Sequence, residues 1–257
     1  MPELAGQIAL VTGASRGIGR AVALAFAAAG ADIGFCHLDD PATAAATEAE
    51  IAACRAPQDM SAGARVLARR VDVADLPALR AFAAEVARRL GPIDILVNNA
   101  GMNIRRRFED YTEAEFDRLL DVHLRATFFL AQAVYPAMCA RGSGCIINIA
   151  SQQALTGSAG AVPYSAAKAG ILGFTRALAR EAAPRGVRVN AIAPGPIETD
   201  LLAGNSEQWR TAFRARLPAG RFGRPDEIAA TALLLAGPSG GFYVGACLSP
   251  NGGDVMH

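Results

Sequence analysis

The sequence has little of what marks a metal site, a disulfide framework or a membrane span. Its 257 residues include three scattered histidines and five cysteines, an odd number with no Cys-x-x-Cys pair. These counts argue against a metal site and favour a reduced, cytoplasmic chain with free thiols. No apolar run approaches the ~18 residues of a membrane span. The amino-terminal MPELAGQIALVTG lacks the basic start of a signal peptide.

An excess of one charge is lacking as well. Lysine and arginine total 25, aspartate and glutamate 24, and the formal net charge is +1. This balance gives no reason to expect nucleic acid or an anionic membrane as a partner. With 52% hydrophobic residues and no Pro/Gly/Ser linker, the chain is expected to form a single domain over residues 1–257.

Apolar strand-like segments alternate with helical ones along the chain. This alternation indicates a doubly wound α/β fold with a parallel sheet, in which a ligand binds beyond the carboxyl ends of the strands. Strands are expected at 7–13, 31–37, 65–72, 92–101, 145–151, 186–199 (with its loop) and 242–253. Helices are expected at 17–30, 41–54, 76–91, 112–138, 163–183 and 224–237, with a long loop at 55–64.

A glycine-rich loop, TGASRGIG, joins the first strand to the first helix. Gly13, Gly17 and Gly19 permit a tight turn and close backbone approach, so that free N–H groups at the helix start can face a pyrophosphate. A strand before the loop and a helix after it are the context that a dinucleotide site requires.

The end of the second strand bears on which dinucleotide binds. His37 and Leu38 stand at the expected strand end, where an acid would bind the ribose hydroxyls of NAD. Arg16, in the glycine loop, is able to pair with a 2′-phosphate, which favours NADP(H). Asp39, just beyond the strand, is an acid of the kind that binds the ribose hydroxyls of NAD, so NAD(H) is the alternative cofactor. In the alternative interpretation neither residue has a role in cofactor binding: Arg16 is a solvated side chain and Asp39 is a turn residue in the loop.

Ser151, Tyr164 and Lys168 form the candidate catalytic group. Pro163 suits the first turn of a helix, so Tyr164 and Lys168 lie four residues apart on one helical face. A neighbouring ammonium stabilises a phenolate and lowers the pKa of a tyrosine, which makes Tyr164 a candidate proton donor or acceptor. Ser151, at a strand end, is placed to meet the same substrate oxygen. Taken alone, the tyrosine and lysine also fit a half-buried packing residue and a solvated one.

Other segments suggest further contacts. The Asp72 carboxylate is a candidate acceptor for the adenine amino group, or a strand-end turn residue. The run Arg105 to Arg107 is either a solvated face or a site for a substrate carboxylate or phosphate. Pro194, Gly195 and Pro196 stiffen a turn able to cover a nicotinamide, and residues 200–224 resemble a mobile helical lid over the substrate.

Taken together, these motifs resemble the classical short-chain dehydrogenase/reductases over essentially the whole chain. The motifs are TGASRGIG, Asp72, NNAG at 98–101, Ser151 thirteen residues before YSAAK, and PGPIET. The resemblance implies a seven-stranded, Rossmann-type domain and reversible hydride transfer between NAD(P)H and a carbonyl or alcohol. It also implies that Tyr164 is the general acid or base, that Lys168 lowers its pKa and holds nicotinamide-ribose hydroxyls, and that Ser151 polarises the substrate oxygen. The implied cofactor contacts are Gly13, Ser15, Arg16, Gly17, Ile18 and Gly19 in the loop, Asp72 and Val73 at adenine, Asn98 and Ala100 after the fourth strand, and Ile197 and Thr199 at the nicotinamide amide.

The sequence departs from the family pattern at two places. His123 stands where the family usually has an asparagine that holds a relay water next to the catalytic lysine. By itself a lone histidine on an apolar face is more often a core residue, but imidazole can donate and accept, so His123 is kept as a catalytic candidate whose titration would alter the pH profile. The second departure is NGG at 251–253 in place of DGG, which we expect to have no catalytic consequence.

The resemblance leaves the substrate open. The chain is similar to 3-oxoacyl-carrier-protein reductases, which makes a 3-oxoacyl thioester a candidate, while NIRRRFEDYTEAEF resembles the sugar-acid and polyol dehydrogenases of the same family. A catalytically idle cofactor-binding or scaffold protein is the alternative of another class. Tetramers are common in the family, so a homo-oligomer, tetramer or dimer, is expected.

Overall fold

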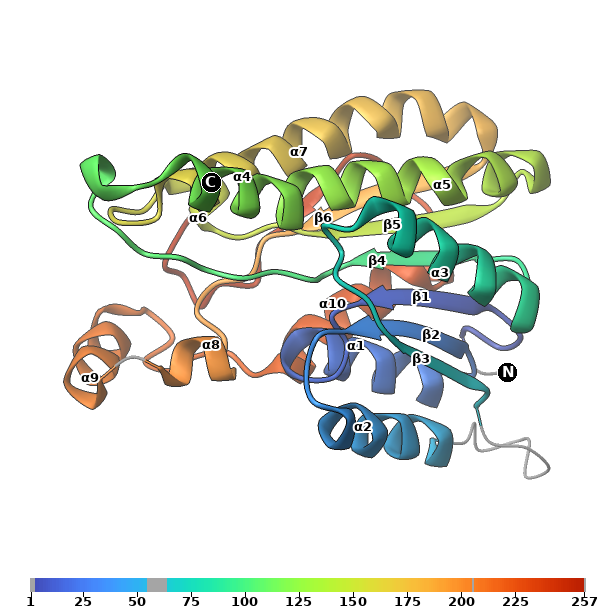
Figure 1. Ribbon diagram of the computed structural model, residues 1–257, viewed down its shortest axis with the longest axis horizontal. Helices are drawn as coiled ribbons and strands as arrows, with labels where there is room; N and C mark the ends of the chain where they lie inside the picture. Colours follow the sequence, from blue (N-terminus) through green and yellow to red (C-terminus); the bar gives the residue numbers. More distant parts are fainter. Residues whose placement is uncertain (1–2, 55–63, 205, 257) are drawn as a thin grey trace.

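The computed structural model describes residues 3–54, 64–204 and 206–256, and Figure 1 shows its layered arrangement. Within these residues seven parallel strands form one sheet in the order β3-β2-β1-β4-β5-β6-β7. The predicted doubly wound α/β fold is thereby confirmed. The strands are β1 Ile8–Thr12, β2 Asp32–His37, β3 Val66–Arg70, β4 Ile95–Asn98, β5 Gly144–Ile149, β6 Val187–Ile192 and β7 Cys247–Leu248.

Helices cover both faces of the sheet (Figure 1). On one face lie α1 Gly17–Ala28, α2 Pro41–Ala53 and α10 Pro225–Ala236. On the other lie α3 Leu76–Arg89, α4 Glu113–Leu120, α5 Ala126–Arg141 and α7 Val162–Ala182. The described residues also form α6 Gln153–Thr156, α8 Asp200–Ala203, α9 Glu207–Arg216, a π-helical turn at Asp121–Arg125, and 3-10 turns at Phe108–Asp110, Ala183–Arg185 and Pro238–Gly240.

Side chains alternate across the sheet because a strand has a period of two residues. In β1, Ala9 and Val11 pack with α1 and α10, whereas Ile8 and Leu10 pack with the helices of the opposite face. All five residues of β1 are buried, as expected for a parallel strand covered on both sides. This two-sided core fixes the carboxyl edge of the sheet, from which the loops of the site emerge.

The helix predicted at 112–138 begins as expected but is not continuous. Thr112 and Glu115 form the expected capping box, with the Thr112 hydroxyl accepting from the Glu115 N–H. The helix then passes through a π-helical turn, Asp121–Arg125, before α5 continues. A π turn adds a residue to the helical repeat and so rotates the side chains around it, and such turns recur at functional sites. His123 lies in this turn.

Other predicted boundaries differ in detail. β3 ends at Arg70, two residues before the predicted end, and β7 keeps only two of the residues expected at 242–253. The predicted lid at 200–224 contains α8 and α9, which form a separate lobe at the lower left of Figure 1. The long loop predicted at 55–64 lies almost entirely outside the described residues. Within the described residues, no helix is both long and apolar enough to cross a membrane.

Candidate active site

The glycine loop lies directly against the end of β4. Gly13 has a φ of +67°, and a Cβ there would lie 2.9 Å from the Ala100 Cα. A Cβ on Gly19 would lie 2.4 Å from the Asn99 amide nitrogen and from the Gly13 carbonyl oxygen. Arg16 is the N-cap residue of α1, and within the described residues its side chain makes no capping hydrogen bond to the helix. The first N–H groups of α1 are therefore left for an anion, which fits the pyrophosphate of a dinucleotide.

Asn99 holds this loop in place, a role that the sequence did not single out. Its side-chain amide donates to the Thr12 and Gly13 carbonyls at 2.9 and 3.1 Å, and the Asn99 and Ala100 N–H groups donate to the Thr12 hydroxyl at 2.9 and 3.0 Å. Asn98, the predicted cofactor contact, turns its side chain into the sheet and donates to the Asn148 side chain at 2.9 Å. Only its position in the NNAG motif could have indicated the role of Asn99.

Acidic side chains surround the predicted adenosine end. The Ser15 hydroxyl donates to Asp39 at 2.5 Å, and the Arg16 guanidinium pairs with Asp39 and Asp200 at 3.2 Å each. Asp72 accepts from the Ala74 N–H at 3.0 Å and pairs with Arg118 at 2.9 Å, and Val73 beside it is buried. The arginine predicted to meet a 2′-phosphate thus lies at this end of the site but is paired with carboxylates.

The turn after β6 lies beside the glycine loop. The Gly195 N–H donates to the Pro250 carbonyl at 3.1 Å, and a Cβ on Gly195 would lie 2.5 Å from the Asn251 Cα. Ile197 is buried, and a Cβ on Gly17 would lie 3.4 Å from the Thr199 Cγ2. Thr199, one of the two predicted nicotinamide-amide contacts, therefore lies directly beside the glycine loop at the carboxyl edge of the sheet.

Ser151, Tyr164 and Lys168 are brought together as predicted. Ser151 follows β5, and α7 places Tyr164 in its first turn, with Pro163 at the start, and Lys168 one turn later. The Ser151 and Tyr164 side chains are hydrogen-bonded, and the Ser151 hydroxyl also accepts from the Gln153 N–H at 3.1 Å. Ser151 and Lys168 are buried and Tyr164 is half-buried. This arrangement presents two hydroxyl groups to one substrate oxygen.

Comparison with known proteins agrees with this geometry. Residues 13–254 match the family model described as enoyl-(acyl carrier protein) reductase. The chain is 41% identical to nodulation protein G of Azospirillum brasilense, over 96% of this chain and 97% of that protein. It is 38% identical to a 3-oxoacyl-(acyl-carrier-protein) reductase of Vibrio cholerae, over 99% of each chain.

Solved structures extend the likeness to the whole fold. A short-chain type dehydrogenase/reductase from Mycobacterium marinum superposes with a TM-score of 0.90 at 32% identity, covering 99% of this chain and 98% of that one. The chain belongs to the short-chain dehydrogenase/reductase family. A blue fluorescent protein from a metagenomic library, solved with NADPH, gives a TM-score of 0.91 at 36% identity, covering 99% and 100% of the two chains. This member of the family is an NAD(P)-dependent oxidoreductase.

The pKa of Tyr164 differs from the prediction for a short-chain dehydrogenase/reductase. Burial of its hydroxyl raises the pKa, and the Ser151 hydrogen bond and the charge of Arg105 lower it by less. The Lys168 Nζ lies 5.7 Å from the centroid of the Tyr164 ring and donates to the Ile149 carbonyl at 2.6 Å. In the protein alone, Lys168 therefore does not produce the lowered tyrosine pKa that the sequence led us to expect.

Lys168 itself has a strongly altered pKa. Lys168 is 3% exposed, and burial lowers the pKa of its ammonium to about 7. The amine thus changes its charge near neutral pH, where an arginine would stay charged.

His123, the departure from the family pattern, contacts Tyr164. Its ring meets that of Tyr164 edge to face, with centroids 5.0 Å apart and an interplanar angle of 88°. His123 Nε2 lies 2.7 Å from the Met102 carbonyl oxygen and 3.3 Å from the Met102 nitrogen, and the buried Nδ1 has no partner among the described residues. Burial and the charge of Lys168 lower the pKa of His123 to about 3. The expectation that titration of His123 alters the pH profile is therefore wrong.

We predict that the Lys168 side chain titrates near pH 7 in the folded, cofactor-free protein. Lys168 is the only lysine in the chain, so selective ¹³C-lysine labelling gives one side-chain signal, whose shift against pH measures the pKa. Between about pH 7 and 10.5 the unfolded chain keeps a proton that the folded protein has released, so this group makes the free energy of unfolding rise with pH over that range. A midpoint near 10.5 would contradict the burial argument.

We predict that His123→Asn leaves turnover within an order of magnitude of the native value. The histidine is neutral above about pH 3, so its removal should add or remove no inflection between pH 5 and 9 in the pH dependence of kcat. Turnover of both proteins at several pH values checks this. A large rise in turnover would show that His123 impairs proton relay in the native chain.

Proposed function

We propose that this protein transfers a hydride reversibly between NADP(H) and a small carbonyl compound or secondary alcohol, and that residues 1–257 form one catalytic domain. The observation that carries the proposal is the hydrogen-bonded pair Ser151 and Tyr164 with Lys168 one helical turn away. Among carbonyl substrates, a 3-oxoacyl thioester is supported by the name of the Vibrio cholerae relative.

Each member of this group has a defined task. A bound nicotinamide supplies or accepts the hydride. In reduction, the Tyr164 hydroxyl gives its proton to the carbonyl oxygen, and in oxidation its phenolate takes the proton of the alcohol. Ser151 donates a hydrogen bond to the same oxygen and orients it. The Lys168 ammonium, where protonated, favours the phenolate and holds ribose hydroxyls of the cofactor.

The cofactor would be held along the carboxyl edge of the sheet. The loop residues Ser15 to Gly19 and the uncapped start of α1 would hold the pyrophosphate. Asp72 and Val73 would meet adenine, while Asn98, Ala100, Pro194, Gly195, Ile197 and Thr199 would border the nicotinamide half. The structural relative solved with NADPH and the position of Arg16 support NADP(H). Asp39 supports NAD(H) as the alternative cofactor, because a carboxylate at this place binds the ribose hydroxyls of NAD.

A sugar-acid or polyol dehydrogenase is the second candidate within the same reaction class. The run Arg105 to Arg107 beside the site favours it, since these substrates include carboxylates. A cofactor-binding or scaffold protein without turnover is the candidate of another class, and the intact Ser151, Tyr164 and Lys168 argue against it.

We further propose a cytoplasmic homo-oligomer, a tetramer or dimer. All five cysteines are free thiols, which fits a reducing compartment. Exposed aromatic side chains such as Phe128 on α5 support an interface between copies of the chain.

We predict that Tyr164→Phe lowers kcat by ~10²- to 10⁴-fold, the usual contribution of a general acid. The assay follows NADPH oxidation at 340 nm with acetoacetyl-CoA and a panel of small ketones. NADPH binding by fluorescence should stay within threefold, which separates chemistry from cofactor binding. Native-like turnover by the variant, or cofactor binding without turnover of any carbonyl or alcohol by the native protein, would contradict the proposed function.

We predict opposite effects from two changes at the adenosine end. Asp39→Asn removes a carboxylate that repels a 2′-phosphate, so the preference for NADPH over NADH should rise by about tenfold. Arg16→Gln removes the cation and should lower that preference by about tenfold. Steady-state kcat/KM ratios for the two cofactors measure both. If Asp39→Asn leaves the ratio unchanged, Asp39 does not face the ribose.

A further inference from the structure

An acidic side chain near the carboxyl terminus lies beside the turn that carries Ser151. We call residues 250–256 the tail. The Gln152 amide nitrogen donates to the Asp254 carboxylate at 2.6 Å, across 102 positions of the chain. The Gln152 side-chain oxygen is buried and has no donor among the described residues, so within them Asp254 is the one hydrogen-bonding partner of this side chain. In Figure 1 the chain end, marked C, lies close to α6, which continues this turn.

The position of Gln152 bears directly on the Ser151 hydroxyl. Ser151 and Gln153 flank Gln152, and the Ser151 hydroxyl accepts from the Gln153 N–H at 3.1 Å. The Gln152 N–H donates to the Pro194 carbonyl at 3.0 Å, and the residue is 8% exposed. A displacement of Gln152 would therefore move both neighbours, and with them the hydroxyl that is hydrogen-bonded to Tyr164.

The tail is held in place without the help of Gln152. The Asn251 side chain donates to the Val255 carbonyl and accepts from the Gly253 N–H, each at 2.8 Å, so the tail folds back on itself. The Pro250 carbonyl accepts from the Gly195 N–H at 3.1 Å. These bonds fix the backbone on either side of the Asp254 carboxylate.

The segment that leaves α9 also packs against the tail. The Ala219 N–H donates to the Gly252 carbonyl at 3.0 Å, and a Cβ on Gly252 would lie 3.3 Å from the Ala219 Cβ. The Arg216 guanidinium lies 3.7 Å from the Asp254 carboxylate, but the Arg216 side chain is 61% exposed, so this ion pair adds little. The Asp254 carboxylate therefore acts mainly on Gln152.

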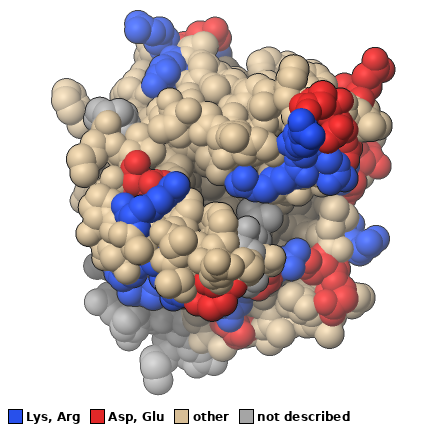
Figure 2. Space-filling view, turned by 90° about the vertical axis from the view of Figure 1, so that its left-hand side faces the viewer, with Lys and Arg blue, Asp and Glu red and all other residues tan. Residues whose placement is uncertain are grey.

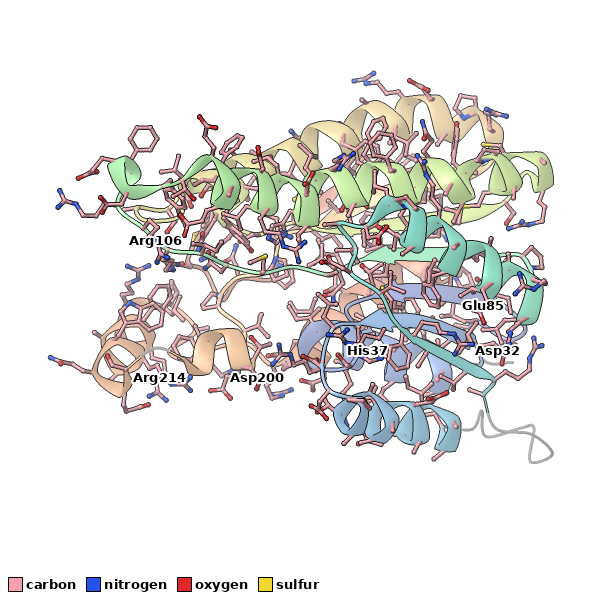
Figure 3. All side chains as sticks on the ribbon, in the orientation of Figure 1. Asp32, His37, Glu85, Arg106, Asp200 and Arg214 are labelled. Atoms are coloured by element: carbon pink, nitrogen blue, oxygen red, sulfur yellow. The ribbon has the colours of Figure 1, made fainter. Side chains whose placement is uncertain are left out.

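The tail joins two parts of the structure at one end of the molecule. In Figure 3 the labelled Arg214 lies on the lobe of α8 and α9, below the labelled Arg106 on the segment after β4. Figure 2 faces this end of the molecule and shows a hollow at its centre. The tail contacts both the Ser151 turn and the segment that leaves the lobe, so it links the catalytic group to the lobe.

We propose that Asp254 is a positioning residue for the hydride transfer, because its carboxylate fixes the Gln152 amide and thereby holds Ser151 against Tyr164. The proposal rests on the function proposed above. A hydrogen bond to a charged acceptor is stronger than one between neutral groups, so a carboxylate holds the amide in one orientation. Within the described residues Asp254 is hydrogen-bonded to neither Tyr164 nor Lys168, so it acts through Gln152.

The test compares variants of Asp254 and Gln152 in NADPH oxidation, with whichever carbonyl compound the native protein reduces. Asp254→Ala removes the acceptor and should lower kcat by about tenfold and change KM by less than about threefold, because a displaced Ser151 slows the chemical step more than binding. Asp254→Asn keeps an oxygen to which the Gln152 amide can donate, so kcat should return to within about threefold of the native value. Gln152→Ala should lose as much as Asp254→Ala, and the double variant no more, because both changes remove one interaction.

A second measurement needs no substrate. The hydrogen bond from Ser151 lowers the pKa of Tyr164, so a displaced Ser151 should raise that pKa. Titration of the Tyr164 signal by ¹³Cζ-tyrosine NMR should show a higher pKa in Asp254→Ala than in the native protein, and a native-like pKa in Asp254→Asn.

Two controls separate positioning from a general disturbance of the fold. Glu207→Gln removes an acid of α9 whose ion pairs, with Arg210 and Arg214, stay within that helix, so kcat should stay within about twofold. Trp209 is the one tryptophan of the chain and lies on α9. Unchanged Trp209 emission, melting temperature and NADPH binding in Asp254→Ala are expected, since the backbone contacts of the tail remain.

The outcomes separate this inference from the proposed function. Native-like kcat and an unchanged Tyr164 pKa in Asp254→Ala would overturn the inference and leave the hydride transfer standing. Equal losses in Asp254→Asn and Asp254→Ala, additive losses in the double variant, or a shifted Trp209 emission with a lowered melting temperature would also overturn it. Absence of turnover by the native protein would contradict the proposed function, and the pKa of Tyr164 would still decide whether Asp254 positions Ser151.

Discussion

Burial of an ammonium and a phenol at one end of a parallel sheet is the constraint on which the site depends. Lys168 is buried and donates to the Ile149 carbonyl, so the end of β5 and the second turn of α7 must stay in register. The chain uses arginine at all 24 of its other basic positions and lysine only here. An arginine stays charged even when it is buried, whereas burial readily lowers the pKa of a lysine. The buried cation of this site is therefore a residue whose charge changes near neutral pH.

The rest of the site is assembled around the carboxyl edge by polar contacts between loops. Asn99 ties the end of β4 to the glycine loop, and Gly195 packs on Asn251 so closely that no side chain fits. The Asn99 contacts bring loops from the two halves of the sheet together between β1 and β4, where the strand order reverses, and the Gly195 contact joins the loops that follow β6 and β7. A dinucleotide laid across this edge would touch both halves, as doubly wound folds allow.

Much of this arrangement could be predicted from the sequence. Features that depend on local sequence patterns lie where they were expected. These are strands β1, β2, β4, β5 and β6, the start of α7 beside Pro163, and the capping box at Thr112. The π turn at His123 could not be predicted, because the apolar repeat on either side reads as one helix. The sequence also did not distinguish the three arginines at 105–107, of which Arg106 pairs with Glu115 and Arg107 with Glu109 in the structure.

Electrostatic balance was the hardest property to infer. The spacing of Tyr164 and Lys168 suggested an ammonium that acidifies a phenol, but spacing says nothing about desolvation. In the folded protein burial is the larger influence on both groups, raising the pKa of Tyr164 and lowering that of Lys168, and Ser151 and Arg105 supply the opposing influence on the phenol.

The most direct measurement of this balance is the pKa of Tyr164 itself, in the native protein and in Ser151→Ala. The chain has four tyrosines, so ¹³Cζ-tyrosine labelling resolves each titration by NMR, and Tyr164→Phe assigns the signal. The account predicts a pKa above 10 in the cofactor-free native protein and a higher value in Ser151→Ala, where the stabilising hydrogen bond is lost. A value below 10 in the native protein, or no rise in the variant, would contradict it.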